Sequence, residues 1–170
     1  DVRPIGVTPD GRNINLDCGS THLASLSRAV VASGARLGIA FDGDGDRALF
    51  VDASGQVVDG DAVLLIAALH LQQEGRLPGD AVVATVMSNI GLEMALRAHG
   101  IGLVRAAVGD KYVMEEMVNR GAALGGEQSG HIIFTDHLPT GDGLATALNL
   151  LRIMAQSGRE LADLAGELVT

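Results

Sequence analysis

The sequence predicts an α/β protein in which a mixed, mostly parallel sheet is layered with helices. Hydrophobic residues make up 47% of the 170 residues, enough to bury a sizeable core. Glycine occurs 23 times and aromatic residues make up only 2%, which favours small-residue packing and many tight turns. Over residues 57–156, β-branched runs alternate with helical patterns, and this alternation is typical of layered domains with parallel strands.

The first part of the chain, residues 1–56, is expected to be the carboxyl-terminal portion of a domain similar to the one that follows. The chain opens on Asp1 rather than Met, so we expect it to be an internal segment of a longer protein. The expected elements of this part are, in order, a strand at residues 14–17, a helix at 23–32, strands at 36–41 and 48–52, and a hairpin turn at 53–56.

Residues 57–156 are expected to form a complete second domain, and residues 157–170 a linker toward a further domain. The helix predicted at residues 62–73 is hydrophobic on nearly every face, so it should be buried. The other expected elements are helices at 89–99, 110–120 and 143–155, and strands at 81–86, 101–108, 122–124 and 131–134.

Charge and cysteine content narrow the possible partners and the cellular compartment. The formal net charge is −9 and there is no basic cluster, which argues against nucleic acid or an anionic membrane as a partner. The longest apolar run, residues 62–69, is too short to span a bilayer. Cys18 is the only cysteine, which excludes a disulfide within the chain and favours a reducing, cytoplasmic location.

Residues 41–47, with the sequence FDGDGDR, carry three carboxylates at alternate positions between two predicted strands. Carboxylates this close repel one another unless a cation lies among them, and the glycines let the backbone fold so that the side chains converge. Asp42, Asp44 and Asp46 are therefore predicted to bind a divalent ion, with Mg²⁺ as the default for oxygen-only ligands. A polar surface turn is the alternative, because Asp and Gly are common turn residues.

This acidic loop, residues 42–47, also resembles the start of an EF-hand calcium loop, but it departs from that pattern. An EF-hand has Gly at its sixth position and Glu at its twelfth, whereas Arg47 and Ala53 stand there, and the predicted flanks are strands. A Mg²⁺ ion held by few protein ligands keeps open positions that phosphate oxygens fill, so the loop suggests phosphate chemistry. Arg47 either contributes a guanidinium to that phosphate or offsets the carboxylates as a structural partner.

Residues 124–131 (LGGEQSGH), the glycine loop, place a Glu, a Gln, a Ser and a His among three glycines. Such a loop brings the backbone close to a ligand and can present a carboxylate and a hydroxyl to adjacent hydroxyl groups of a sugar. Glu127 and Ser129 are therefore candidate substrate-binding residues. His131 is a candidate general acid or base near neutral pH, although a hydrogen-bonded histidine at the start of a strand is the simpler interpretation.

Three other segments place polar residues at the ends of expected elements. Asp110 is a natural N-cap, and Lys111 lies in the first turn of a helix, where the helix dipole favours acids, so it hints at an anionic ligand. Residues 85–89 end a strand and begin a helix, a common position for ligand contacts in parallel sheets, although helix capping is the default interpretation. Residues 140–143 are interpreted as a cap or turn.

Taken together, residues 42–47 (DGDGDR) and residues 126–131 (GEQSGH) resemble the motifs of the α-D-phosphohexomutase superfamily. The resemblance runs over nearly the whole chain, and its other segments are residues 14–15, 18–21, 85–89, 108–112 and 140–143. It implies a four-domain enzyme. This chain would then hold part of domain 2 and all of domain 3, and its partners would be domains 1 and 4 of the same protein.

The resemblance implies a mutase that moves a phosphoryl group between O6 and O1 of a phosphosugar, through a phosphoserine and a bisphosphorylated sugar. It also implies Mg²⁺ as cofactor. The implied residues are Asp42, Asp44 and Asp46 for the metal, Glu127, Ser129, Arg47 and Asp110 for the substrate, and His131 and Lys111 as candidate catalytic groups. Gln128 favours glucosamine phosphate as substrate, in the pathway to UDP-N-acetylglucosamine, with mannose or glucose phosphates as the alternative.

The sequence departs from the superfamily pattern in ways that affect activity. The serine loop that carries the nucleophile and the second phosphate-clamping loop do not occur in it, so this chain alone is expected to bind metal weakly and not to turn over. Gly45 replaces the usual Ala, which should change the stiffness of the acidic loop more than its ligands. A non-catalytic module that binds metal or sugar phosphate is the alternative, and an exposed apolar edge favours self-association.

Overall fold

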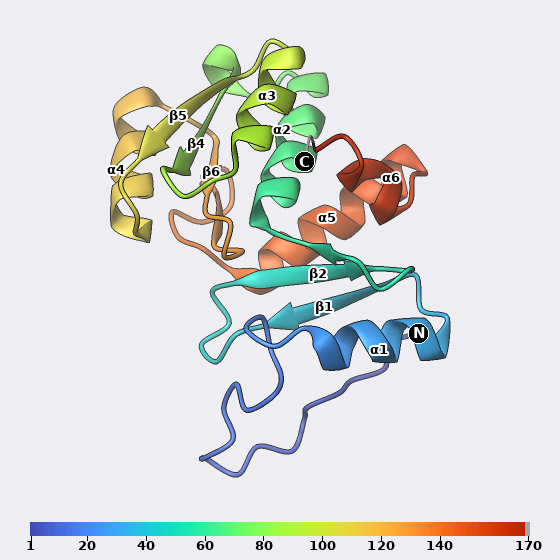
Figure 1. Ribbon diagram of the computed structural model, residues 1–170. Coiled ribbons are helices and arrows are strands. Elements are labelled where there is room, and N and C mark those ends of the chain that lie inside the picture. Colours follow the sequence, from blue (N-terminus) through green and yellow to red (C-terminus); the bar gives the residue numbers. More distant parts are fainter. Residues whose placement is uncertain (169–170) are drawn as a thin grey trace.

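The computed structural model describes residues 1–168 (Figure 1). In space the chain forms two parts, a small sheet backed by one helix and a larger layered α/β part. The elements in chain order are α1 (Ala24–Ser33), β1 (Leu37–Phe41), β2 (Ala48–Asp52), β3 (Val57–Val58), α2 (Gly60–Gln73), the 3₁₀ turn η1 (Pro78–Asp80), β4 (Ala81–Thr85), α3 (Ile90–Ala98), β5 (Gly102–Ala106), α4 (Asp110–Arg120), β6 (Leu124–Gly126), β7 (Ile132–Phe134), α5 (Gly143–Ser157) and α6 (Leu161–Ala165).

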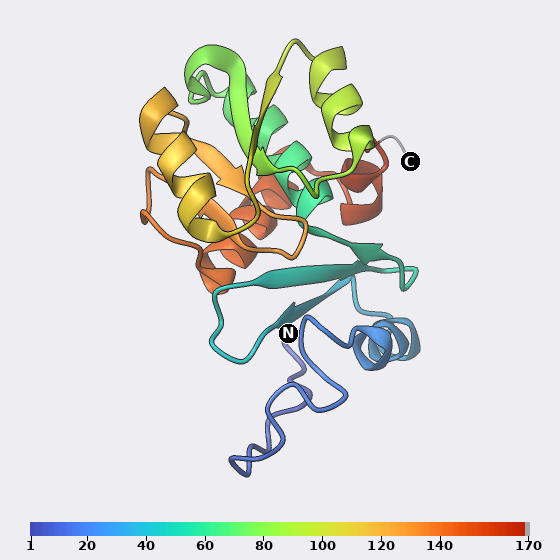
Figure 2. The same ribbon diagram turned by 60° about the vertical axis from the view of Figure 1, so that its left-hand side comes forward.

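The first sheet is antiparallel and has the strand order β1-β2-β3. β1 and β2 pair along their whole lengths, with Phe41 opposite Ala48, so residues 42–47 form the connection between them. The turn after β2 is fixed by Asp52, whose carboxylate accepts a hydrogen bond from the main-chain N–H of Gln56 (3.0 Å). Helices α1 and α5 both contact this sheet, and Figures 1 and 2 show α1 on its far side from the larger part.

The second sheet has the order β5-β4-β6-β7, in which β4 pairs in parallel with β5 and β6, and β7 runs antiparallel to β6. This arrangement confirms the expected mixed, mostly parallel sheet layered with helices. Side chains of β4 alternate between its faces: Val82 and Ala84 join the main core with α2, whereas Val83 joins a smaller core with α4. Because β4, β5 and β6 run parallel to one another, their carboxyl ends lie at the same edge of the sheet.

Helix α2 is buried on nearly every face, as its sequence predicts. It packs against α3, α5, α6 and β6. The main core also contains Phe50 of β2 and Val58 of β3, so the two parts of the chain share one hydrophobic core. Although α2 is apolar, neither it nor any other described helix combines the length and hydropathy needed to cross a membrane.

Several stretches differ from the predicted elements. The strand predicted at residues 122–124 lies instead at Leu124–Gly126 (β6), and the 3₁₀ turn η1 was not predicted. Residues 14–17 form turns rather than a strand, because Asn15 and Asp17 take φ values of 57° and 52°, in the left-handed region that a strand does not contain. The two-residue strand β3 was not predicted, since so short a segment has no readable periodicity. In the stretch assigned to a linker, α6 forms a helix whose Leu161 is 1% exposed in the main core.

Candidate functional site

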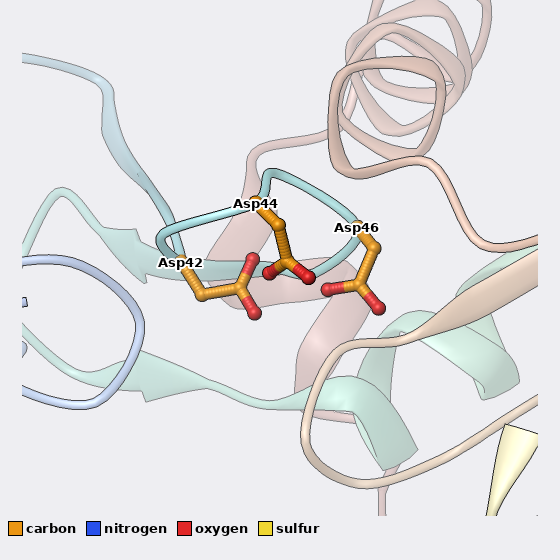
Figure 3. Close-up of side chains that lie close together, drawn as sticks. All are labelled: Asp42, Asp44 and Asp46. Carbon is orange, nitrogen blue, oxygen red and sulfur yellow. The ribbon is translucent and has the colours of Figure 1, made fainter.

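The acidic loop joins β1 to β2 and turns its three aspartates toward one another (Figure 3). One carboxylate oxygen from each of Asp42, Asp44 and Asp46 lies within 4.8 Å of the others. Gly45 has a φ of 76°, a left-handed conformation that favours glycine and reverses the chain between the second and third carboxylates. The structure thus brings the three predicted ligands together, while their role in binding metal stays a prediction.

Among residues 1–168, little positive charge offsets these carboxylates. The Nε of Arg47 is 3.6 Å from Asp42 Oδ2 and 3.8 Å from Asp46 Oδ1, and the main-chain N–H of Arg47 donates to Asp42 Oδ1 (3.2 Å). Burial raises the pKa of Asp46, and the neighbouring carboxylates of Asp42 and Asp44 raise that pKa further. The acidic loop is therefore short of cationic partners, which favours the binding of a cation from solution.

Main-chain hydrogen bonds hold the acidic loop against the larger part of the chain. The N–H of Gly143, at the start of α5, donates to the carbonyl of Gly45 (2.9 Å), and the N–H of Ala48 donates to the carbonyl of Gly130 (3.1 Å). A Cβ at Gly143 would lie 2.8 Å from the Gly45 carbonyl oxygen, and a Cβ at Gly130 would overlap the carbonyl of Ala48. The acidic loop is therefore joined by its backbone to the start of α5, and Ala48, which directly follows the acidic loop, is joined to the glycine loop. At Gly130 and Gly143 a side chain would clash with these backbone contacts.

His131 lies at this junction. Its Nε2 is 3.6 Å from Asp46 Oδ2, and the residue is 4% exposed. Gly141 packs against the imidazole so closely that a Cβ there would overlap the ring. Within residues 1–168 the shielded Nδ1 has no hydrogen-bond partner. The structure thus places this candidate catalytic residue beside the acidic loop, with one ring nitrogen uncommitted.

The glycine loop contains β6 and the turn that connects it to β7, and a hydrogen bond from the N–H of Gly130 to the carbonyl of Glu127 (3.0 Å) closes that turn. Oε1 of Glu127 accepts a hydrogen bond from the N–H of Gly109 (3.0 Å), on the segment that follows β5. Ser129 Oγ is shielded from solvent and has no hydrogen-bond partner in the described chain. Glu127 is thereby oriented by the neighbouring segment, and Ser129 keeps a hydroxyl free of internal partners.

Asp110 and Lys111 lie outside this cluster. The N-cap of α4 is Gly109, whose φ of 126° suits glycine, so the predicted N-cap role of Asp110 is wrong. The Asp110 carboxylate instead accepts a hydrogen bond from the N–H of Lys111 (2.7 Å). The Lys111 side chain is 74% exposed, with its Nζ 3.8 Å from Glu115. In the part of the chain that the structure describes, neither residue pairs with the acidic loop.

Sequence reasoning missed two contributors near the start of α2. Asp59 caps the helix and also accepts a hydrogen bond from Nε2 of Gln128 in the glycine loop (3.1 Å). Asp61 is 0% exposed, and its Oδ2 accepts a hydrogen bond from the N–H of Asn89 (2.7 Å). The two acids were visible in the sequence as helix-start charges, but only the fold shows that they reach loops at the end of the parallel strands.

The donor set of the acidic loop fits a hard divalent cation. The three aspartates offer oxygen atoms alone, and no His or Cys joins their group among residues 1–168. Carboxylate oxygens select Mg²⁺, Ca²⁺ or Mn²⁺ over softer metals. So few protein ligands leave coordination positions that water or phosphate oxygens can fill.

Comparison with known proteins agrees with this geometry. The family described as phosphoglucomutase/phosphomannomutase, α/β/α domain III, matches residues 59–170. A phosphoglucosamine mutase of Solibacter usitatus (strain Ellin6076) is 59% identical over 168 residues, which cover 99% of this chain and 38% of that relative. This chain therefore spans well under half the length of the relative.

Two solved structures share the fold. A phosphoglucomutase/phosphomannomutase family protein of Burkholderia thailandensis has a TM-score of 0.77 and 30% identity, covering 89% of this chain and 33% of that one. An N-acetylphosphoglucosamine mutase of Aspergillus fumigatus, solved in complex with GlcNAc-6P and magnesium, has a TM-score of 0.72 and 20% identity, covering 91% and 40% of the two chains. At 20% identity, the similarity to the Aspergillus fumigatus structure is one of fold alone.

The layered fold and the paired loops define a protein of the phosphohexomutase class. The chain belongs to the phosphoglucomutase/phosphomannomutase family, and the match to domain III of that family covers residues 59–170. This confirms the resemblance to which the acidic-loop and glycine-loop motifs point.

Proposed function

We propose that this chain forms the metal-binding and sugar-binding parts of a Mg²⁺-dependent phosphosugar mutase. The reaction is the interconversion of glucosamine 6-phosphate and glucosamine 1-phosphate through a phosphoserine and a bisphosphorylated sugar, in the pathway to UDP-N-acetylglucosamine. The observation that carries the proposal is that the glycine loop lies against the acidic loop: His131 is 3.6 Å from Asp46, and the N–H of Ala48, directly after the acidic loop, donates to the carbonyl of Gly130. Identity of 59% to a phosphoglucosamine mutase supports the amino sugar as substrate.

In this proposal the three aspartates of the acidic loop hold Mg²⁺, which when bound would polarise the oxygens of a phosphoryl group. Glu127 and Ser129 bind adjacent hydroxyl groups of the sugar and so orient its ring. His131, which is buried against Asp46, holds or releases a proton at the reacting sugar oxygen. The nucleophilic serine and the second phosphate clamp come from further domains of the mutase.

The remaining predicted residues take subsidiary roles. Arg47 already lies beside Asp42 and Asp46, so its main role is to offset their charge, and contact with the substrate phosphate is secondary. Asp110 and Lys111 are exposed at the start of α4 and reach the substrate only when a further domain encloses the site.

We assign residues 1–56 to part of domain 2, residues 57–156 to domain 3 and residues 157–170 to the approach to domain 4.

Calorimetric titration of the 170-residue chain with Mg²⁺ tests the metal site. The wild-type chain should bind Mg²⁺ weakly, and Asp44→Ala should weaken binding at least about tenfold, because one of only three anionic ligands is lost. Asp163→Ala removes an exposed carboxylate on α6 and serves as the matched control. Equal heats from the chain and the Asp44→Ala variant would remove the acidic loop from the proposal.

Kinetics of the complete mutase with a panel of sugar phosphates tests which sugar is the substrate. Glucosamine 6-phosphate should give the highest kcat/KM, and the 170-residue chain alone should show no turnover, since the serine nucleophile lies outside it. The second candidate is a phosphomannomutase or phosphoglucomutase, which the family description and the Burkholderia thailandensis neighbour favour. Preference for mannose or glucose phosphate would select that alternative, and binding without turnover in the complete protein would indicate a non-catalytic module.

We further propose a cytoplasmic location and weak self-association of the isolated chain. Cys18 is free, as suits a reducing compartment. The apolar side chains of Val2, Ile5 and Val7 are at least half exposed in the amino-terminal segment, which offers a surface for a second copy. A clean monomer in sedimentation experiments would contradict the self-association.

A further inference from the structure

Asp61 is a buried carboxylate to which the proposed reaction gives no role. It lies in the first turn of α2, is 0% exposed, and its Oδ1 has no hydrogen-bond partner among residues 1–168. Its Oδ2 accepts a short hydrogen bond from the main-chain N–H of Asn89 (2.7 Å). Burial raises the pKa of Asp61, and the hydrogen bond from Asn89 and the nearby Ser88 hydroxyl oppose that rise. A carboxylate kept in so unfavourable a place needs a structural or functional reason.

The group that Asp61 holds is the segment 86–89, which connects β4 to α3. Arg105 contacts the same segment, where its Nη1 donates to the carbonyl of Ser88 (3.1 Å). The N–H of Val86 donates to the carbonyl of Ala106 (2.9 Å), which continues the pairing with β5. The backbone of this segment is therefore fixed at both ends.

Two large side chains of this fixed segment are nevertheless exposed, whereas Ser88 is buried. Val86 and Met87 are 57% and 66% exposed, although both are large and apolar. β4 lies between β5 and β6, so segment 86–89 emerges between the Gly109 segment after β5 and the glycine loop after β6. Those two neighbours are joined by the hydrogen bond from Gly109 to Glu127. Ligands of parallel sheets bind at the carboxyl ends of the strands, which is where this segment lies.

We propose that Asp61 is a positioning residue, which holds segment 86–89 so that Val86 and Met87 form an apolar wall of the sugar-phosphate site. This inference rests on the proposed function above. The carboxylate acts on the substrate through Asn89 and the backbone of the segment. Helix capping does not explain the contact between Asp61 and Asn89. Asp59 already caps α2, and Asn89 already caps α3.

The first measurement is amide hydrogen exchange at Asn89 in the 170-residue chain. Asp61→Leu removes the acceptor, so protection of the Asn89 amide should fall at least about tenfold. Asp61→Asn retains an oxygen acceptor in the same shape and should keep most of the protection. Asp61→Ser is the second disrupting variant if the leucine variant does not fold, because serine is too short to reach Asn89 yet suits a helix start.

The second measurement is steady-state kinetics of the complete mutase. Asp61→Leu, or Asp61→Ser, should raise KM for the sugar phosphate about tenfold with a smaller change in kcat, since the segment contacts bound substrate rather than the reacting atoms. Asp61→Asn should restore KM toward the wild-type value. Leu161→Ala, a core change in α6, is the control for lost stability and should leave KM unchanged.

Protection of Asn89 that survives in the disrupting variant would overturn the anchoring contact. Lost protection with an unchanged KM would overturn the role in substrate binding. A wild-type protein without mutase activity would overturn the proposed function and, with it, the substrate role of Asp61. The exchange measurement on Asn89 does not depend on activity, so the two failures are distinguishable.

Discussion

The acidic loop and the glycine loop meet at the same junction but differ in how their charges are satisfied. In the acidic loop, Asp42, Asp44 and Asp46 turn toward one another, and burial and the neighbouring carboxylates raise the pKa of Asp46. In the glycine loop, the carboxylate of Glu127 already accepts the N–H of Gly109. The first loop holds unbalanced charge and needs a partner from solution, whereas the second has its carboxylate oriented by the protein itself.

This difference separates two ways in which a loop can be made ready for a ligand. In the acidic loop the three carboxylates repel one another and a bound cation would offset that repulsion, so cation binding should stabilise the loop. Around the glycine loop, Gly60, Gly126 and Gly130 let backbone pack on backbone, so we expect this loop to be rigid without a ligand. Substitutions should therefore damage the stability of the second loop and the metal affinity of the first.

The largest expected effect comes from breaking the packing of the glycine loop at Gly60. The N–H of Gly60 donates to the carbonyl of Gln128 (2.9 Å), and a Cβ at Gly60 would overlap the carbonyl of Glu127. Because both contacts are with backbone, Gly60→Ala should lower the free energy of unfolding by about 3 kcal/mol, measured by urea denaturation.

Gly102→Ala is the matched control for that prediction. Its Cβ would lie 3.8 Å from the nearest atom, the carbonyl oxygen of Asp80, so the change should be worth less than about 0.5 kcal/mol. Similar midpoints for the two alanine variants would mean that the glycine loop yields to a side chain and is not rigid.

A smaller effect is expected when the Glu127 carboxylate is replaced. Glu127→Leu leaves the N–H of Gly109 without its acceptor, at a cost of about 1–2 kcal/mol in the free energy of unfolding. Glu127→Gln keeps an oxygen at that position and should cost less than half as much. If the two variants are equally stable and Gly109 exchanges its amide proton at the same rate in both, Glu127 is not held by this hydrogen bond.

The sequence predicted the elements that carry strong periodicity or turn chemistry. The bounds of β2 and α4 match the predicted ranges, and the apolar residues of α2 indicated its burial. The convergence of the three aspartates followed from their spacing and from Gly45, which needs no long-range information. Residues 14–17 misled because their apolar side chains suggest a strand, while the local backbone of Asn15 and Asp17 prevents one.

What the sequence did not predict are contacts made between distant segments. The hydrogen bonds of Gly143 with Gly45 and of Ala48 with Gly130 join backbone groups, which leave no side-chain pattern to read. Asp61 looked like an ordinary acid at a helix start, because its partner, the N–H of Asn89, lies 28 residues away along the chain. The N-cap of α4 was assigned to Asp110 because aspartate is a favourable capping residue, but the preceding residue, Gly109, occupies that position.

The smallest effect, and the one that tests the acidic loop most directly, is expected from Asp46→Asn. The pKa of Asp46 is raised in the folded chain, so its ionised form lowers stability at pH values above that pKa, and the penalty disappears as the pH falls below the unfolded value of about 3.9. In metal-free solution near neutral pH, the variant should therefore be more stable than the wild-type chain by about 0.5 kcal/mol, with the gain shrinking toward acid.

Saturating Mg²⁺ should reverse the order of stability, because the wild-type chain keeps the third anionic ligand and gains more from the ion. Thermal unfolding across pH, with and without Mg²⁺, measures both effects, and a variant less stable than the wild-type chain in metal-free solution would show that the contacts of Asp46 with Arg47 and His131 outweigh the repulsion among the aspartates.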